Sequence, residues 1–256
     1  MKTLVLDFDG VIVDSMNEGL FTSFNTYIEI NPNTKLFGNK KFSFNDFKKK
    51  IKDHKTEYDK FRAYRAYLKN AIDYYYQLNL IESNTKIKNY GGFKIQAAKI
   101  GVNKKEFIER FYKNRKGYIA NDFENWVKLT PIFNHMKRLF ENKKIQLYIS
   151  TSNRSETVQR TLGHYGIKFN PESIMDNTFS LDKNDHFRNL MKKNNVNSKD
   201  IFFVDDQVDH LINAKKLGIN IGLASWGYNN KEQKKEAKKI GAVMLSENNF
   251  YSKIGI

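Results

Sequence analysis

The 256-residue sequence contains no cysteine, which excludes disulfide bonds, zinc sites with cysteine ligands and catalysis by a thiol. It has only three prolines, too few for a proline-rich linker between domains. No stretch approaches the roughly 18 apolar residues that a transmembrane helix needs. The first apolar run, residues 4–6, is too short for a signal peptide. We therefore expect a cytoplasmic protein with no membrane partner.

Acidic residues are fewer than basic ones, 28 against 44, and the net charge at pH 7 is +16. Residues 15–130 hold 23 Lys and Arg and 12 Asp and Glu, a net +11, and the remaining 140 residues carry +5. Such a charge is compatible with nucleic acid, an anionic membrane surface or an acidic substrate. A compositional bias toward Lys and Asn would also produce it. The excess belongs mainly to one region.

That region also differs in its residue pattern. From Ser15 to about Trp126, aromatic and aliphatic residues recur at spacings of three and four, which is typical of amphipathic helices. One or two helices are predicted within residues 47–78, and another begins at the Asn103 cap with Glu106 at its third position. We expect the Tyr and Phe side chains of these helices to form a core.

After Thr130 the pattern changes to alternating helices and strands. Predicted helices over 131–142, 155–166, 185–195 and 208–218 alternate with predicted strands over 145–149, 201–204, 219–224 and 242–246. Such alternation indicates a parallel sheet with right-handed crossovers, which the isolated strand at 4–6 should join. The sequence thus predicts an α/β fold. Residues 1–15 and 127–256 would form a Rossmann-like parallel-sheet core, and residues 16–126 an inserted α-helical cap domain.

Two acidic residues follow the first strand at once. In "LVLDFDGVIVDS", Asp7 and Asp9 come directly after a buried strand, and Gly10 frees the backbone for a tight turn. Neighbouring carboxylates repel one another and resist ionisation, so a positive group is expected between them. Aspartate is also a common turn residue, but that explains one of the two acids more easily than both.

Polar residues follow two further strands of the predicted sheet. Ser150 and Thr151 end one strand, and Asp205 and Asp206 end another, with Asp209 one turn later. In an open parallel sheet these ends meet at one edge, where ligands bind. Helix capping accounts for Asp206 or Asp209, but not for the gathering of acids at that edge. A hard cation does account for it, and Mg²⁺ fits because it takes only a few carboxylates.

Hydroxyl groups and one lysine are candidates for binding an anion. Asn153 is predicted to cap the next helix with Glu156 as its reciprocal partner, which leaves Ser150 without a structural task. Ser150, directly after the strand, is best placed to donate to an oxygen anion. Lys183 stands two or three residues before a predicted helix, and a lysine beside a helix N-terminus makes an anion site. These groups together fit phosphoryl transfer through a carboxylate nucleophile.

With these motifs the sequence resembles the haloacid dehalogenase superfamily of hydrolases. "DFDGVIVDS" resembles the first motif of that family, Ser150 and Lys183 match the second and third by position, and "FFVDDQVDH" resembles the acidic fourth. "KKLGINIGLASWGYNN" and "GAVMLS" are similar to the tail of phosphoglycolate-phosphatase-like members. The insertion after the first motif is similar to the helical cap of this group. Two departures are Asn184, where Pro is usual, and Val204, where many relatives have Gly or Glu.

The resemblance implies a Mg²⁺-dependent phosphatase that acts on a small phosphorylated molecule. Asp7 would attack phosphorus, and Asp9 would protonate the leaving oxygen and later activate water. Asp7, the backbone carbonyl of Asp9, and Asp205 or Asp206 would bind Mg²⁺. Closing the cap would keep bulk water from the aspartyl-phosphate. The residues implied in binding phosphate oxygens are Ser150, Thr151, Lys183 and the backbone N–H groups after Asp7, including that of Gly10.

Other functions stay open at this point. Dehalogenation needs neither a second acid nor Mg²⁺, so Asp9 and the fourth-motif acids argue against it. A phosphosugar mutase would use the same groups and differ mainly in the behaviour of the cap. A nucleic-acid-binding or end-processing protein could use the basic cap with its interleaved Tyr and Phe, but would leave the catalytic set unexplained.

Two arginines of the basic segment are candidates for substrate specificity. Arg62 and Arg65, in "FRAYRAYLKN", are three residues apart and are expected on one helical face. Tyr64 and Tyr67 share that spacing on an adjoining face, where they can pack into the cap. The arginines would read a second anionic group on the substrate. The alternative is a charged face that is simply solvated.

Overall fold

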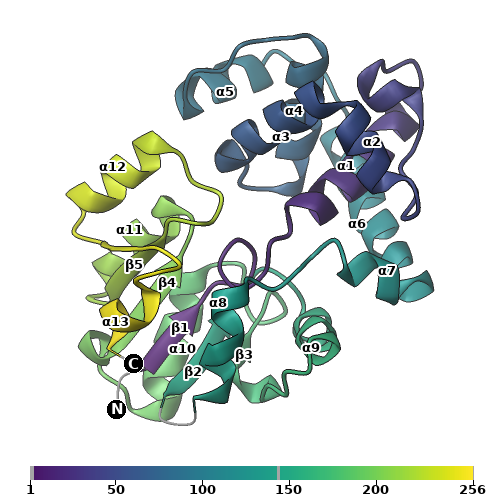
Figure 1. Cartoon of the computed structure of the whole chain (residues 1–256). Coiled ribbons are helices and arrows are strands. Elements are labelled where there is room, and N and C mark those ends of the chain that lie inside the picture. Colours follow the sequence, from purple (N-terminus) through teal and green to yellow (C-terminus); the bar gives the residue numbers. More distant parts are fainter. Residues whose placement is uncertain (1–2, 143–144, 256) are drawn as a thin grey trace. The chain divides into compact units, whose positions relative to one another are not determined.

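The computed structural model describes residues 3–142 and 145–255. It divides the chain into two compact units, Met1–Asp14 with Pro131–Ile256, and Ser15–Thr130 (Figure 1). The sequence places these boundaries after residues 15 and 126, and the compact units change after residues 14 and 130. No helix in the described ranges is both long and apolar enough to cross a membrane.

The first unit contains a six-stranded parallel sheet in the order β3-β2-β1-β4-β5-β6, which confirms the predicted α/β fold. β1 lies in the centre, and Leu6 is in register with Ile149 on one side and Val204 on the other. The C-terminal ends of β1, β2 and β4 therefore lie side by side. The strands are β1 (Thr3–Leu6), β2 (Gln146–Ser150), β3 (Ile174–Met175), β4 (Ile201–Asp205), β5 (Asn220–Ala224) and β6 (Val243–Leu245).

Helices connect these strands in sequence. The predicted helix over 131–142 begins later, because α8 starts at Asn134 and continues as a 3-10 turn. Lys183 is the first residue of α10 and does not precede it as expected. The elements are α8 (Asn134–Lys137), η3 (Arg138–Glu141), α9 (Ser155–His164), η4 (Pro171–Ser173), α10 (Lys183–Asn194), η5 (Ser198–Asp200), α11 (Val208–Lys216), α12 (Lys231–Lys239) and α13 (Phe250–Ile254).

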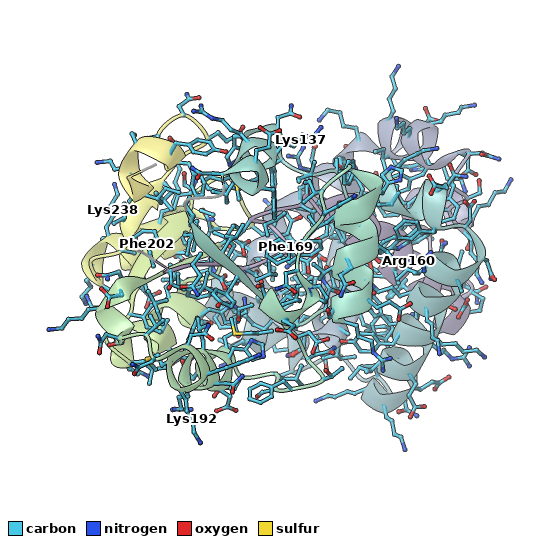
Figure 2. All side chains as sticks on the ribbon, turned by 90° about the horizontal axis from the view of Figure 1, so that it is seen from below. Lys137, Arg160, Phe169, Lys192, Phe202 and Lys238 are labelled. Carbon is cyan, nitrogen blue, oxygen red and sulfur yellow. The ribbon has the colours of Figure 1, made fainter. Side chains whose placement is uncertain are left out.

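Both faces of the sheet are buried, as the apolar run of β1 requires. Successive side chains of a strand point to opposite faces, so Leu4 and Leu6 join one apolar cluster and Val5 joins the other. Phe169 packs on the cluster of Leu4 and Leu6, and Lys192 projects outward from α10 (Figure 2).

The second unit is helical and its core is aromatic, as predicted. Phe24 is fully buried, with its ring centroid 4.9 Å from those of Phe37 and Phe42. The segment 47–78, predicted as one or two helices, contains α2, α3, a 3-10 turn and part of α4. The elements are α1 (Met16–Ile30), η1 (Leu36–Asn39), α2 (Phe47–Asp53), α3 (Lys55–Tyr64), η2 (Arg65–Tyr67), α4 (Ala71–Glu82), α5 (Tyr90–Ala97), α6 (Lys104–Asn121) and α7 (Phe123–Val127).

Candidate active site

Asp7 lies immediately beyond β1, where it continues the pairing with β4. Its backbone N–H donates to the carbonyl oxygen of Val204 at 2.9 Å. Lys183, from the first position of α10, places its Nζ 2.7 Å from Asp7 Oδ1 and 2.7 Å from Asp205 Oδ2. All three side chains are buried. Lys183 is thus a positive group beside Asp7, but it joins Asp7 to Asp205 at the ends of β1 and β4 and not Asp7 to Asp9 as expected.

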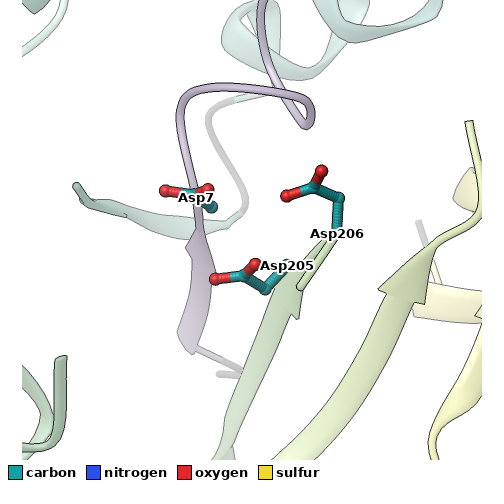
Figure 3. A group of neighbouring side chains, drawn as sticks. All are labelled: Asp7, Asp205 and Asp206. Carbon is teal, nitrogen blue, oxygen red and sulfur yellow. The ribbon is translucent and has the colours of Figure 1, made fainter. Parts of the chain in front are cut away.

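A third carboxylate completes a buried acidic group. Asp7, Asp205 and Asp206 each offer an oxygen, and these oxygens lie within 4.8 Å of one another (Figure 3). The single ammonium of Lys183 cannot neutralise three buried carboxylates, because like charges at this separation repel strongly in a low dielectric. Carboxylate oxygens are the ligands that Mg²⁺ prefers. The donor set therefore fits this cation, and Asp9 contributes no side-chain oxygen to it.

The acids of this group differ in protonation. Burial raises the pKa of Asp7 to about 6, and the neighbouring Asp205 adds to the rise, although Lys183 opposes it. Burial also opposes the ionisation of Asp205, but Lys183 and His210 hold its pKa below the usual range. Burial lowers the pKa of Lys183, yet Asp205 and Asp7 together raise it above its ordinary value. The cluster therefore keeps Lys183 and Asp205 charged.

The two acids after β4 are fixed by different donors. His210 Nδ1 lies 2.9 Å from Asp205 Oδ2, and the backbone N–H of Gln207 donates to Asp205 Oδ1 at 2.7 Å. Asp206 Oδ2 accepts from the backbone N–H of Tyr228 at 2.6 Å. Asp205 is therefore held on both of its oxygens. Sequence reasoning missed His210 in this role, since nothing in its neighbourhood marks it as a partner of Asp205.

Gly10 makes the tight turn that the sequence predicts, and its N–H is used within that turn. It adopts φ +78°, and its backbone N–H donates to the carbonyl oxygen of Val13 at 2.8 Å, so the turn already uses the group expected to bind phosphate. A Cβ atom at Gly10 would lie 2.6 Å from Asp206 Oδ2. Glycine is required here because the turn passes directly over a carboxylate.

The hydroxyl of Ser150 is also occupied, contrary to the expectation that it lacks a structural task. His186 Nε2 lies 2.9 Å from the carbonyl oxygen of Ser180, so Nε2 carries the proton. Burial lowers the pKa of His186 and favours the neutral ring, whose Nδ1 then accepts. In this tautomer Ser150 Oγ, 2.8 Å from that Nδ1, donates to it. The buried Thr151 instead accepts at Oγ1 from the N–H of Asn153 at 3.0 Å, which leaves its own proton to donate.

Asn153 does not cap α9, so that prediction is wrong. The helix begins at Ser155, and Asp176 at the end of β3 accepts from the N–H of Ser155 at 2.7 Å. Asn153 Nδ2 instead donates to Asp9 Oδ2 at 2.6 Å. The spacing of Asn153 and Glu156 suits a capping box, but Asp176, 21 positions after Ser155, takes that task. The sequence carried no sign of Asp176.

Arg62 and Arg65 belong to the other compact unit. The helix α3 ends at Tyr64, so Arg62 lies in its last turn and Arg65 in the following 3-10 turn. The two arginines lie over different rings. The guanidinium carbon of Arg62 is 5.8 Å from the ring centroid of Tyr58, and that of Arg65 is 5.5 Å from the ring centroid of Tyr74. A role for either arginine in reading the substrate stays a prediction.

A family model described as haloacid dehalogenase-like hydrolase matches residues 68–224. The matched segment is more than half of the chain, so the protein belongs to this family and is a hydrolase. The segment includes Thr151, Lys183 and the acids after β4. No curated protein matches the chain significantly.

Several solved structures share the fold. A predicted phosphatase from Clostridium acetobutylicum has a TM-score of 0.57 and 16% identity, covering 99% of this chain and 98% of its own. A predicted phosphoglycolate phosphatase from Haemophilus somnus reaches 0.61 at 16% identity, with coverage of 99% and 98%. A haloacid dehalogenase-like hydrolase from Streptococcus pneumoniae reaches 0.61 at 13% identity, again with 99% and 98%. At such identities the likeness concerns the fold.

Proposed function

We propose that this protein is a Mg²⁺-dependent phosphatase that hydrolyses a small phosphate monoester through an aspartyl-phosphate on Asp7. The observation that carries the proposal is the buried contact of Asp7 with Lys183, next to Asp205 and Asp206 at the same sheet edge. Phosphatases among the structures of the same fold support it. The substrate phosphate and the metal ion would both bind next to Asp7, the nucleophile.

In the first half of the reaction, a carboxylate oxygen of Asp7 attacks phosphorus and the bond from phosphorus to the ester oxygen breaks. Asp9 transfers its proton to that oxygen, so the leaving group departs as a neutral alcohol. In the second half, Asp9 takes a proton from water, which attacks the same phosphorus. The bond to Asp7 then breaks, and inorganic phosphate and the free Asp7 carboxylate are formed.

Three kinds of donor would bind the remaining phosphate oxygens. The hydroxyl of Thr151 has its proton available, unlike that of Ser150. The backbone N–H groups of Phe8 and Asp9 donate to no acceptor among the described residues, and they would form the anion-binding turn in place of Gly10. Lys183 would add a full positive charge beside the nucleophile.

Asp7 and Asp206 would hold the metal ion directly, together with the backbone carbonyl of Asp9, and Asp205 would support the site through its hydrogen bonds with Lys183, Gln207 and His210. When bound, Mg²⁺ would reduce the repulsion between the Asp7 carboxylate and an anionic phosphate. It would also favour the ionised form of Asp7, which is the nucleophilic form.

The test is release of inorganic phosphate from a panel of phosphate monoesters, with Mg²⁺ and with EDTA. We expect turnover that requires Mg²⁺ and falls by several orders of magnitude in Asp7→Asn. Acid quenching should trap a phosphoryl group on Asp7, measurable as a mass increase of the peptide that contains it. Isomerised sugar phosphate without release of free phosphate would indicate a mutase instead. Full turnover in Asp7→Asn would exclude the covalent mechanism.

A further inference from the structure

We propose that Asn153 is a positioning residue for Asp9, holding one oxygen of this carboxyl so that the other faces the ester oxygen. The inference rests on the proposed function and adds a named residue to its proton-transfer step. The sequence pattern predicts that Asn153 caps a helix, whereas in the structure its side chain hydrogen-bonds to Asp9 instead.

The contact joins two loops that are distant in sequence. Asp9 follows β1 and Asn153 follows β2, 144 positions later, and Asn153 Nδ2 lies 2.6 Å from Asp9 Oδ2. Asn153 is only 7% exposed. Its own backbone N–H donates to Thr151 Oγ1 at 3.0 Å, which fixes the loop that carries the amide. The Asn153 amide is therefore positioned by a hydrogen bond to Thr151, whose hydroxyl is proposed to bind phosphate.

A neutral donor suits the task of Asp9. The nucleophile Asp7 must stay ionised, and it faces the ammonium of Lys183. Asp9 donates a proton in the first half of the reaction and accepts one in the second, so its partner must hydrogen-bond to the carboxyl in both states. An amide N–H hydrogen-bonds to a carboxyl oxygen in either state and does not titrate. It occupies Oδ2, so the exchanged proton belongs on Oδ1.

The helix that follows does not depend on this amide. Asp176 accepts from the first N–H of α9, and Arg154 occupies the N-cap position without a side-chain bond. Removing the Asn153 amide should therefore leave α9 intact. The variant should lose the orientation of the Asp9 carboxyl, which slows the steps in which Asp9 transfers a proton.

The experiment compares two leaving groups in the Mg²⁺-loaded full-length protein. p-Nitrophenol leaves readily without a proton, whereas an alkyl alcohol must be protonated as it departs. The value of kcat/KM reports the step that cleaves the ester bond. In Asn153→Ala we expect kcat/KM to fall by about tenfold or more for an alkyl phosphate, within the range of general acid catalysis. For p-nitrophenyl phosphate it should fall by about threefold or less, because this leaving group draws little on the acid.

Two further variants complete the design. Asn153→Leu has nearly the same shape and no donor, so it should reproduce the change in selectivity without a cavity. Ser152→Ala alters the exposed neighbour on the same loop and should leave kcat/KM unchanged for both substrates. The ratio of the two kcat/KM values is independent of the fraction of folded enzyme, so partial misfolding cannot imitate the effect.

An equal loss on both esters, or no loss on either, would overturn the role of Asn153 while leaving the proposed function standing. A parent protein that hydrolyses neither ester, nor any other of the panel, would overturn the proposed function and this inference with it. Selective loss for the alkyl ester in both Asn153 variants would support the inference.

Discussion

The carboxyl groups of Asp7 and Asp205 share one lysine but differ in their other neighbours. Asp205 also accepts from His210 and from the Gln207 N–H, and these donors stabilise its ionised form. Asp7 has Lys183 on one oxygen and two acids nearby, and its burial raises the pKa to about 6. Two residues of the same type in one cluster therefore have different charge states at moderately acidic pH when no metal is bound.

This difference predicts how stability depends on pH in the presence of EDTA. The pKa of Asp7 rises from 3.8 to about 6 on folding. The folded state therefore favours the protonated carboxyl, and stability falls as pH increases through this range. Asparagine resembles the protonated form. Asp7→Asn should therefore be more stable than the parent at pH 7.5, by up to about 3 kcal/mol.

Urea unfolding at several pH values would measure this effect. The advantage of Asp7→Asn should shrink to nothing only well below pH 3.8, where Asp7 of the parent is protonated in both the folded and the unfolded state. The control is Asp200→Asn, which removes an exposed acid outside the cluster. A constant advantage at every pH would show that Asp7 does not titrate as its surroundings imply.

The two hydroxyls after β2 give a second prediction at this scale. Ser150 donates its proton to His186, and Thr151 has its proton available. Thr151→Val keeps the shape of the side chain and should lower kcat/KM for phosphate esters by about tenfold or more, as removal of a transition-state donor does. Ser150→Ala should lower it by about threefold or less and should act mainly on stability. The reverse order would restore Ser150 as the phosphate donor.

At the scale of the elements, the loop after β5 packs closely against the turn after β1. A Cβ atom at Gly227 would lie 2.4 Å from the carbonyl oxygen of Gly10 and 2.4 Å from Asp206 Cβ. The side chain of Tyr228 contacts the same turn, because its hydroxyl donates to Asp14 Oδ1 at 2.9 Å. The loop therefore fixes both an acid of the candidate metal site and the exit of the turn.

This close approach predicts that Gly227→Ala is destabilising. The Gly10 carbonyl oxygen and the Asp206 Cβ cannot move away without shifting the backbone that carries them, so we expect a loss of about 1–3 kcal/mol in the free energy of unfolding. Gly163→Ala is the matched control, since a Cβ atom at this position in α9 meets nothing within 4 Å. It should stabilise by about 0.5–1 kcal/mol, as expected for alanine in a helix. Equal stability of both variants would contradict the packing described here.

The elements also show what the sequence could and could not predict. The apolar runs of β1 and β4 are buried on both faces, so these strands could be recognised from the sequence. The acids at their ends could then be predicted to lie at one edge of the sheet. The strand β3 has only two residues, Ile174 and Met175, and depends on its pairing with β2. The roles of Asn153 and Asp176 could not be predicted because each depends on a tertiary contact, and a local capping pattern suggested another assignment.

At the scale of the whole molecule, the sheet unit is complete without the helical one. Its apolar clusters are formed by residues 4–13 and 132–254. Replacing residues 15–130 by a short Gly/Ser linker should give a folded core that unfolds cooperatively and binds Mg²⁺ by isothermal titration. The control is the same deletion with Asp206→Asn, which should fold but bind the ion more weakly. A core that shows no cooperative transition would mean that the helical unit contributes to its stability.

The chain leaves the sheet unit after Asp14 and returns to it at Pro131, and the N–H of Asp14 donates to the carbonyl oxygen of Pro131 at 2.8 Å. The helical segment therefore leaves and rejoins the sheet unit at one point, as a closed loop. The entropy of closing a loop grows only with the logarithm of its length, so doubling the insertion would cost the core only about 0.6 kcal/mol. Insertions of very different size and sequence could occupy this position, and a lineage could exchange the helical segment without redesigning the sheet unit.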